Sequence, residues 1–425
     1  MLREIPEGWE VHRIADVASV KGGKRMPAGR PFADGKTDHP YIRVSDFSDG
    51  SINRAGIVYV LPEDQKLIAR YTISCRDVYI SIAGTIGVCG MIPPDLDGAQ
   101  LTENAAKIAV QSEAQLMPEF LALLLSSQVV QRQISTAKGV GGGVPKLALF
   151  RIEGMTIPVP PLHEQRRIAE ILSGVDAAIA ATRAVIEQTR KVKQGVLERL
   201  LTKGIGHTHF KQTEIGEIPE GWPLTTAEDV CTQISVGIVI KPSHYYAETG
   251  IRCFRSANVR EGFVEDADWV YITEEGNRVN RKSVLRTGDV LVVRTGYPGT
   301  SCVVPPRYDG ANCIDIIFAR PKNELIEATF LSTFINSESG KMQVLKAEGG
   351  LAQKHFNVGA MKQMKLPLPP ISEQREIVAH VDEFASNEAV LEQTLQQQIR
   401  AKSALMSDLL TGRRRVADTL PMAAE

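Results

Sequence analysis

Apolar residues recur at alternating steps of four and three along residues 164–201. Three polar residues, Thr182, Thr189 and Lys193, stand at the same steps. This spacing puts an apolar stripe on one face of an α-helix and is typical of a coiled-coil seam. The predicted apolar seam positions are Ile168, Leu172, Val175, Ile179, Ile186, Val196 and Leu200.

A second stretch, residues 373–409, has the same pattern in the same register. Proline pairs at 160–161 and 369–370 precede the two stretches, and Gly204 and Gly412 follow them. Proline stops a helix from extending upstream, and glycine favours helix ends, so we predict two helices of equal length. The apolar seam positions of the second are Ile377, Val381, Phe384, Leu391, Leu395, Leu405 and Leu409.

A helix of about 38 residues would be roughly 57 Å long, so its apolar face needs a partner longer than a small domain. We expect the two helices to pair with each other in antiparallel orientation. Chain order then sets two globular domains apart on a pseudo-twofold axis, the geometry with which dimeric DNA readers bind separated half-sites. The alternative is that each helix packs on its own domain or in a homo-oligomer.

The regions before the two helices contain short β-rich runs separated by glycine-rich turns. Runs at 41–44, 57–60, 78–83 and 290–295 predict strands, and residues near 117–134 and 328–346 predict helices. The expected fold class is therefore a tandem of two α/β (α+β) domains separated by two long antiparallel coiled-coil helices.

The chain also repeats its own sequence once. The segment IPEGW occurs at 5–9 and 218–222, and PVPPLHEQRRI from Pro158 matches PLPPISEQREI from Pro367. Glu164 then matches Glu373 without an insertion in the helices that follow. Chance similarity at a few proline and glycine positions is the alternative to a duplication. We expect domains at 1–160 and 206–369, helical spacers at 161–205 and 370–413, and a C-terminal tail at 414–425.

Composition indicates a globular protein of more than one domain. The chain has 425 residues, of which 43% are apolar and 23% charged, and its formal net charge is -1. It contains no apolar run long enough for a membrane span or secretory signal, so we expect a cytoplasmic protein. The six cysteines form no C-x-x-C pair, and we expect buried, reduced thiols.

The sequence lacks the motifs of methyltransferases, ATP-driven motors and catalytic metal sites. It contains neither the glycine-rich cofactor loop nor the Asn/Asp-Pro-Pro-aromatic strip of a nucleotide methyltransferase, and no phosphate-binding loop of an ATP-driven motor. The histidines lack metal-site spacing, and triplets such as Asp34-Gly35-Lys36 are common by chance. We therefore expect no catalytic residue, no metal and no bound cofactor in this chain.

Basic and polar residues in the expected loops are candidates for DNA contact. Arginine and asparagine can each bond a base edge through two hydrogen bonds, whereas lysine more often binds phosphate. Any one of them could equally be a solvated surface residue, as we expect for the run Arg413 to Arg415. The candidates are Lys21, Lys24, Arg25, Arg43, Ser45, Lys138 and Lys146 in the first domain, and Lys241, Arg255, Ser256, Asn258, Arg294 and Lys354 in the second.

Together the doubled IPEGW segment and the doubled P-P-L/I-x-E-Q-R signature resemble the specificity subunits of Type I restriction-modification systems, over the whole chain. The resemblance implies that each domain reads one half of a split target in double-stranded DNA and that the helices fix the gap. It implies two methyltransferase subunits that use S-adenosylmethionine to methylate adenine. It further implies two motor-nuclease subunits that use ATP and Mg. Recognition domains diverge within this family, so base contacts cannot be transferred.

Two other functions fit the same pattern. One is a coiled-coil scaffold with two ligand-binding domains unrelated to DNA, which the near-neutral charge permits. The other is a detached specificity module for a fused methyltransferase-nuclease of another restriction type.

Overall fold

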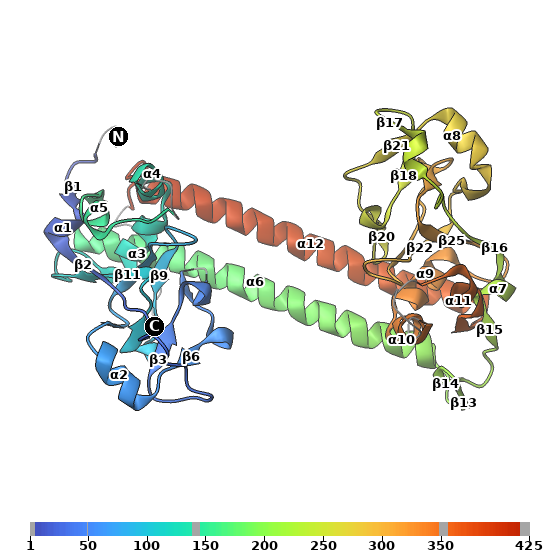
Figure 1. The fold of residues 1–425 in the computed structure, drawn as a ribbon, viewed down its shortest axis with the longest axis horizontal. Helices are drawn as coiled ribbons and strands as arrows, with labels where there is room; N and C mark the ends of the chain where they lie inside the picture. The colour runs from blue at the N-terminus through green and yellow to red at the C-terminus, as the bar shows by residue number, and fades with distance from the viewer. Residues whose placement is uncertain (1–4, 49, 138–144, 348–355, 417–425) are drawn as a thin grey trace. The chain divides into compact units, whose positions relative to one another are not determined.

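The computed structural model describes residues 5–48, 50–137, 145–347 and 356–416 (Figure 1). The chain divides into two compact units, unit 1 with Met1–Arg183 and Gln393–Glu425, and unit 2 with Ala184–Glu392. Each unit contains a mixed α/β domain and a part of two long helices, α6 (Leu162–Lys203) and α12 (Ile371–Leu409). The predicted fold class is confirmed in these features.

The domain of unit 1 alternates short strands with short helices. Its helices are α1 (Ile14–Val17), α2 (Pro62–Ile68), α3 (Pro118–Ser126), α4 (Gln128–Ala137) and α5 (Leu149–Glu153). Its strands are β1 (Glu10–Arg13), β2 (Ala18–Gly22), β3 (Pro40–Ile42), β4 (Phe47–Ser48), β5 (Ser51–Ile52), β6 (Val58–Tyr59), β7 (Thr72–Ile73), β8 (Val78–Ser81), β9 (Cys89–Met91), β10 (Ala99–Leu101), β11 (Ala105–Val110) and β12 (Thr156–Val159).

Two four-stranded sheets organise unit 1. The sheet β2-β11-β8-β9 is antiparallel, and α3 packs against β8 and β9. Its core also includes Ile168 and Leu172 from the first turns of α6. The sheet β6-β3-β10-β7 contains one parallel pair, β3 with β10, and contributes to a smaller core around Ile42.

Unit 2 repeats this plan. Its helices are α7 (Ala227–Val230), α8 (Glu274–Val279), α9 (Ala328–Asn336), α10 (Glu338–Ala347) and α11 (Val358–Gln363). Its strands are β13 (Phe210–Thr213), β14 (Gly216–Pro219), β15 (Leu224–Thr226), β16 (Cys231–Val236), β17 (Tyr246–Ala247), β18 (Ile251–Phe254), β19 (Val259–Arg260), β20 (Phe263–Val264), β21 (Val270–Ile272), β22 (Val290–Val293), β23 (Ser301–Val303), β24 (Asn312–Cys313), β25 (Ile316–Pro321) and β26 (Lys365–Pro367). The sheet β16-β25-β22-β23 has the strand order of its counterpart in unit 1, and β18 pairs with β24 in parallel as β3 does with β10.

Matching aspartates explain one of the repeated sequence positions. Asp77, just before β8, accepts a hydrogen bond from Lys107 of β11 at 2.9 Å. Asp289, just before β22, accepts two from Arg320 of β25 at 2.7 and 2.8 Å. Both carboxylates are nearly buried, so each needs a cation as its partner. In each unit this ion pair links two strands of the sheet.

Each helix expected near 117–134 and 328–346 is in fact two helices. Ser127 separates α3 from α4, and Ser337 separates α9 from α10, both with extended backbone angles. Each serine hydroxyl donates to the carbonyl oxygen three residues earlier at 2.6 Å, which satisfies an acceptor at the end of the preceding helix. A single buried serine thus ends a helix whose apolar pattern continues.

Within unit 1, the beginning of α6 lies against the end of α12. Ile168 shares a core with Leu409, and the Asp176 carboxylate contacts the Lys402 ammonium at 2.5 Å. A higher residue number in α6 is therefore matched by a lower one in α12. The two helices are antiparallel in this unit, as predicted.

Unit 2 contains the other parts of both helices, again antiparallel. The Arg190 guanidinium contacts the Glu388 carboxylate at 2.6 Å, and Leu201 shares a core with Ile377. In both units the predicted apolar seam positions are buried or half-buried, whereas the charged positions between them are mostly exposed. The repeating seam buries the apolar face that a single long helix would leave in water.

The cysteines are free thiols, five of them buried. Cys75 differs from the expectation because it is only half-buried. Among the described residues, no helix is both long and apolar enough to cross a lipid bilayer.

Candidate functional site

Four loop segments meet at one edge of the domain in unit 1, and we call them loop cluster 1: residues 23–25, 82–87, 101–105 and 145–147. The Gly23 amide donates to Ala105 at 3.0 Å, and the Lys24 amide donates to Leu101 at 2.8 Å. The Leu147 amide donates to the carbonyl oxygen of residue 82 at 2.8 Å. A Cβ at position 23 would lie 2.2 Å from a carbonyl oxygen, so glycine is required for this approach.

Unit 2 contains the same arrangement, loop cluster 2: residues 237–241, 293–299, 313–316 and 356. The Gly237 amide donates to Ile316 at 2.9 Å, and the Ile238 amide donates to Cys313 at 2.8 Å. The Phe356 amide donates to the carbonyl oxygen of residue 294 at 3.2 Å. A Cβ at position 237 would again lie 2.2 Å from a carbonyl oxygen. These bonds fix which positions of the two clusters correspond.

Each cluster contains an ion pair, although the two arginines come from different segments. In loop cluster 1, Arg25 donates to Glu103 at 2.6 Å. Burial alone would raise the pKa of Glu103, but hydrogen bonds from Arg25 and Thr102 outweigh it and lower that pKa. In loop cluster 2, Arg294 donates to Asp315 at 2.6 Å. Each loop edge therefore contains a charged pair near its surface.

The signature segments hold each domain to its helix. In unit 1 the Trp9 indole donates to Glu164 at 3.3 Å, and in unit 2 the Trp222 indole donates to Glu373 at 3.0 Å. The tryptophan of IPEGW and the glutamate of the Glu-Gln-Arg triplet are thus hydrogen-bond partners. The repeated sequence indicated both residues, but not that they meet.

In each unit, the signature glutamate also contacts the segment that follows the other long helix. In unit 2 the His207 ring contacts Glu373 at 2.8 Å, just after the end of α6. In unit 1 the Arg415 guanidinium donates to Glu164 at 3.0 Å, just after the end of α12. Arg415 is therefore not the simple solvated helix end expected from the sequence, because its charge is matched by a nearly buried carboxylate.

A family model described as Type I restriction modification DNA specificity domain matches residues 6–189 and again residues 219–401. The chain belongs to this family. Each match begins at an IPEGW segment and extends into a long helix, so the family domain is the repeated unit recognised in the sequence.

Several relatives match this chain over nearly its whole length. The Type I restriction enzyme MjaVIII specificity subunit of Methanocaldococcus jannaschii is 28% identical, and the match covers 97% of this chain and 94% of the relative. The EcoKI specificity subunit of Escherichia coli strain K12 is 23% identical, with coverage of 96% and 88%. A chain from a structure on complex assembly and conformational transition of the type I R-M system has the same fold, with a TM-score of 0.65, 21% identity and coverage of 96% and 98%.

Six of the residues predicted to contact DNA lie in or next to the loop clusters. Lys24, Arg25 and Lys146 belong to loop cluster 1, which Lys21 precedes at the end of β2; Lys241 and Arg294 belong to loop cluster 2. All but Arg294 are exposed. Two further candidates, Lys138 and Lys354, lie outside the described residues. The structure thus brings candidates from distant parts of the sequence to one edge of each domain.

The other candidates surround a turn at corresponding places in the two domains. Arg43 donates to Asp46 at 3.1 and 3.2 Å, and Ser45 lies beside it at the surface. Arg255 donates to the carbonyl oxygen of Asp268 at 2.6 Å, and Ser256 is half-buried beside it. These arginines hold their own turns together.

Asn258 requires a correction. Its side chain is fully buried, accepts a hydrogen bond from the Arg255 amide at 3.0 Å and donates to the Ala267 carbonyl oxygen at 2.8 Å. A buried amide with internal partners stabilises the turn and does not present its edge to a base. Asparagine is a candidate because its amide can bond the edge of an adenine, but residue type alone does not predict that Asn258 points inward.

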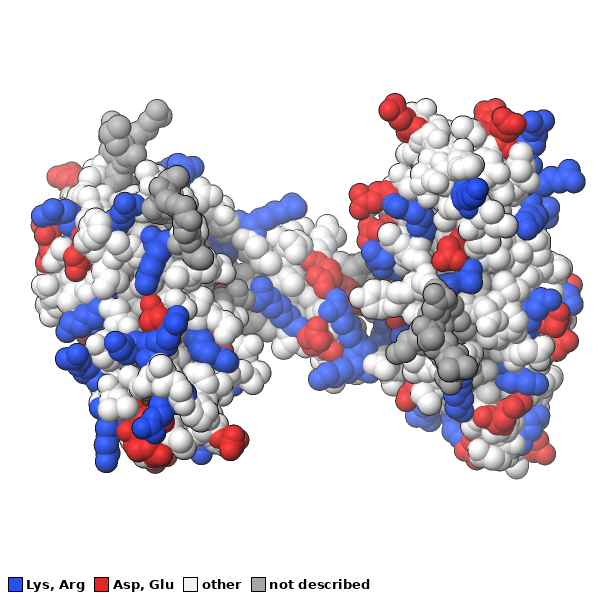
Figure 2. All heavy atoms as spheres, in the orientation of Figure 1, with Lys and Arg blue, Asp and Glu red and all other residues white. Residues whose placement is uncertain are grey.

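Charge is mixed over the surface of the specificity subunit. Figure 2 shows Lys and Arg side chains interspersed with Asp and Glu on the visible face of each unit, in keeping with the formal net charge of -1. Attraction to a polyanion must therefore come from local groups such as those of the loop clusters. Among the described residues, no group of three or more His, Cys, Asp or Glu side chains is arranged to hold a metal ion.

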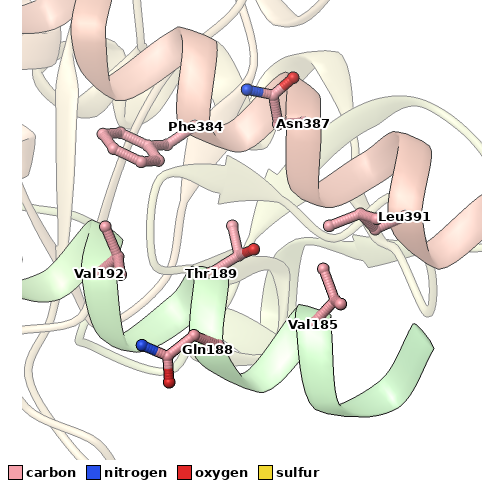
Figure 3. Close-up of a pocket in the computed structure, with 7 residues that line it drawn as sticks. All are labelled: Val185, Gln188, Thr189, Val192, Phe384, Asn387 and Leu391. Carbon is pink, nitrogen blue, oxygen red and sulfur yellow. The ribbon is translucent and has the colours of Figure 1, made fainter. Parts of the chain in front are cut away.

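The helix pair opens into a groove in unit 2, with a volume of about 360 Å³. Figure 3 shows Phe384 and Leu391 of α12 pointing toward α6, whereas the Gln188 amide points away from α12. The small seam residue Thr189 leaves the space between them partly unfilled. The lining residues are Val185, Gln188, Thr189, Val192, Phe384, Asn387 and Leu391.

Beside this groove, Glu388 makes the helix pair of unit 2 sensitive to acid. The Arg190 hydrogen bond, opposed by burial and aided by Lys193, lowers the pKa of Glu388 below its ordinary 4.5. A carboxylate with a lowered pKa in the folded state stabilises that state above the unfolded value, and the contribution is lost as pH falls through the folded value. The Arg190–Glu388 pair should therefore stabilise the helices at neutral pH and not in acid.

We expect a double-mutant cycle of Arg190→Met and Glu388→Gln to give a coupling energy of about 1 kcal/mol or less at pH 7, because both side chains are partly exposed. The coupling should shrink as the pH is lowered below 4.5. Denaturant unfolding of the full chain measures it. Arg167→Met is the matched control, since Arg167 pairs with Glu170 on its own helix. A coupling unchanged by acid would contradict the assignment.

Proposed function

We propose that this chain is the DNA sequence-specificity subunit of a Type I restriction-modification complex. Each recognition domain reads one half of a bipartite target in double-stranded DNA, and the helix pair sets the gap between the halves. The observation that carries the proposal is the double match to the specificity-domain family, with one loop cluster built in the same way in each matched region. Exposed basic residues at these clusters suit contact with phosphates and base edges.

We further propose that the chain is not catalytic by itself. Two methyltransferase subunits dock on its helices and recognition domains and transfer a methyl group from S-adenosylmethionine to the N6 atom of adenine. Two motor-nuclease subunits use ATP and Mg to cleave unmodified DNA, and the complex works in the cytoplasm. The naming of the relatives as specificity subunits of restriction enzymes supports this division of labour. The missing methyltransferase and motor motifs in the sequence agree with it.

Sequencing of methylated adenines in the host tests the proposal. A bipartite methylated motif is expected in the presence of this gene and should vanish when the gene is deleted. Restoring the gene with residues 10–155 replaced by those of another family member should change one half of the motif and leave the other half and the gap intact, because that segment supplies only loop cluster 1.

The control is the unaltered gene supplied in the same way, which should restore the original motif. A motif that persists after deletion would exclude the proposed function. A change in both halves after the exchange would show that the two domains do not read independently.

A further inference from the structure

The two loop clusters share a backbone but present different side chains. The turn of loop cluster 2 at Gly296–Gly299 corresponds to Gly84–Gly87 of loop cluster 1, because Gly299 donates to Val293 and Gly87 donates to Ser81, both at 3.0 Å. Tyr297 thus occupies the place of Thr85. Likewise, Val239 occupies the place of Arg25.

Tyr297 and Ile240 are exposed to an unusual degree. Their exposed fractions, 84% and 78%, are the two highest among the exposed large hydrophobic residues in the described part of the chain. Val239, next to Ile240, is 49% exposed. Several exposed apolar side chains in one loop cluster are more informative than a single one, because removing apolar surface from water lowers the free energy.

Fixed backbone turns hold these side chains outward. The Thr300 amide and hydroxyl both donate to the Tyr297 carbonyl oxygen, at 3.2 and 2.9 Å, and Gly299 packs closely on Val344. Lys241, which follows Ile240, has a left-handed backbone with φ 43°, a conformation that costs free energy in a non-glycine residue. Tyr297 and Ile240 therefore lie in or next to turns with a defined backbone, one of which is strained.

The polar groups between these turns bond to the protein itself. Arg294 donates to Asp315 at 2.6 Å and to the Phe356 carbonyl oxygen at 3.3 Å, and Thr295 donates to Asp315 at 3.3 Å. The Asp315 amide in turn donates to the Ile238 carbonyl oxygen at 3.2 Å. Asp315 thus links the turn that carries Tyr297 to the segment that carries Ile240, and the apolar side chains are left outermost.

We propose that the recognition domain of unit 2 reads a thymine in its half-site through apolar contact of Tyr297 and Ile240 with the thymine 5-methyl group. This inference rests on the proposed function. The 5-methyl group is the apolar feature that base edges offer in the major groove. At the corresponding edge of unit 1, Thr85 takes the place of Tyr297 and Arg25 that of Val239, and Met26, in the place of Ile240, is half-buried.

Uracil tests the inference, because it pairs as thymine does but lacks the methyl group. The complex is purified from the host through a tag on the full-length chain. It is bound to duplexes of its methylation motif in which each thymine of the unit 2 half-site is replaced in turn by uracil. At one thymine, on either strand, we expect binding to weaken about three- to fivefold, the effect of one buried methyl group.

The variant Tyr297→Ala should weaken binding and remove the difference between the thymine and uracil duplexes at that position. Tyr297→Leu, which keeps an apolar side chain, should preserve part of the difference. The matched control is Thr85→Ala at the corresponding place in loop cluster 1, which should leave the difference in the unit 2 half-site unchanged. Because Tyr297 is so exposed, these changes are not expected to affect folding.

Three results would overturn the inference while the proposed function stands: a half-site without thymine on either strand, equal binding of every uracil duplex, or a full difference retained by Tyr297→Ala. If the purified complex prefers no bipartite sequence at all, the proposed function is excluded, and this inference is excluded with it.

Discussion

Replacing Gln374 by leucine is expected to lower the free energy of unfolding of unit 2 by about 3 to 5 kcal/mol, since several buried polar groups lose their partner at once. The Gln374 side chain is fully buried. Its oxygen accepts from the Glu327 amide at 2.9 Å, and its nitrogen donates to the carbonyl oxygens of Leu325 and Pro369, each at 2.9 Å. Leucine fills a similar volume but cannot form any of these three hydrogen bonds.

Denaturant unfolding of the full-length chain gives the loss, and hydrogen exchange locates it. Amides of α9, which begins next to Glu327, should exchange faster, whereas those of α3 in unit 1 should keep their protection. Arg375→Ala is the matched control, because Arg375 is the neighbouring signature residue but makes an exposed pair with Glu327, worth about 1 kcal/mol or less. Equal losses from the two substitutions would refute the role given to Gln374.

Unit 1 uses the same residue in the same way. Gln165 accepts from the Met117 amide at 2.8 Å, at the start of α3, and donates to the carbonyl oxygens of Gln115 and Pro160, each at 2.8 Å. The glutamine of the Glu-Gln-Arg signature therefore joins a domain to the helix that follows it. The signature is repeated because each domain needs this joint, whatever DNA sequence it reads.

Much of the fold could be predicted because its signals are local. The helix seam depends on a short repeat, and the duplication is visible in matched segments such as IPEGW. The positions of Ser127 and Ser337 were not predicted as helix ends, because the apolar pattern runs through both of them. Whether such a serine turns its hydroxyl back to the preceding turn depends on the tertiary packing around it.

The candidate site was only partly accessible from the sequence. Lys24 and Lys146 could be chosen as basic loop residues, but their meeting at one edge depends on backbone bonds between segments far apart in the chain. Residue type makes Asn258 a candidate, but its side chain is buried. Charge and hydrogen-bonding capacity do not point to Tyr297, although an aromatic residue in the turn Gly296-Tyr297-Pro298-Gly299 has little chance of burial.

Lengthening the helix pair should change the DNA gap and leave both half-sites unaltered. Four residues inserted into α6 between 183 and 184, and four into α12 between 392 and 393, fall where the chain passes from one unit to the other. Each insertion adds about 6 Å of helix, at about 1.5 Å per residue. One base pair spans about 3.4 Å along a DNA strand, so the gap should widen by about two base pairs.

Sequencing of methylated adenines in a host that carries the doubly extended gene measures the new gap. Insertion into α6 alone is the control: it shifts Arg190 and the rest of its seam against Glu388, so pairing is lost and methylation should fall without a defined longer gap. An unchanged gap in the doubly extended protein would exclude the helices as the spacer, because the added length would then have no counterpart in the DNA.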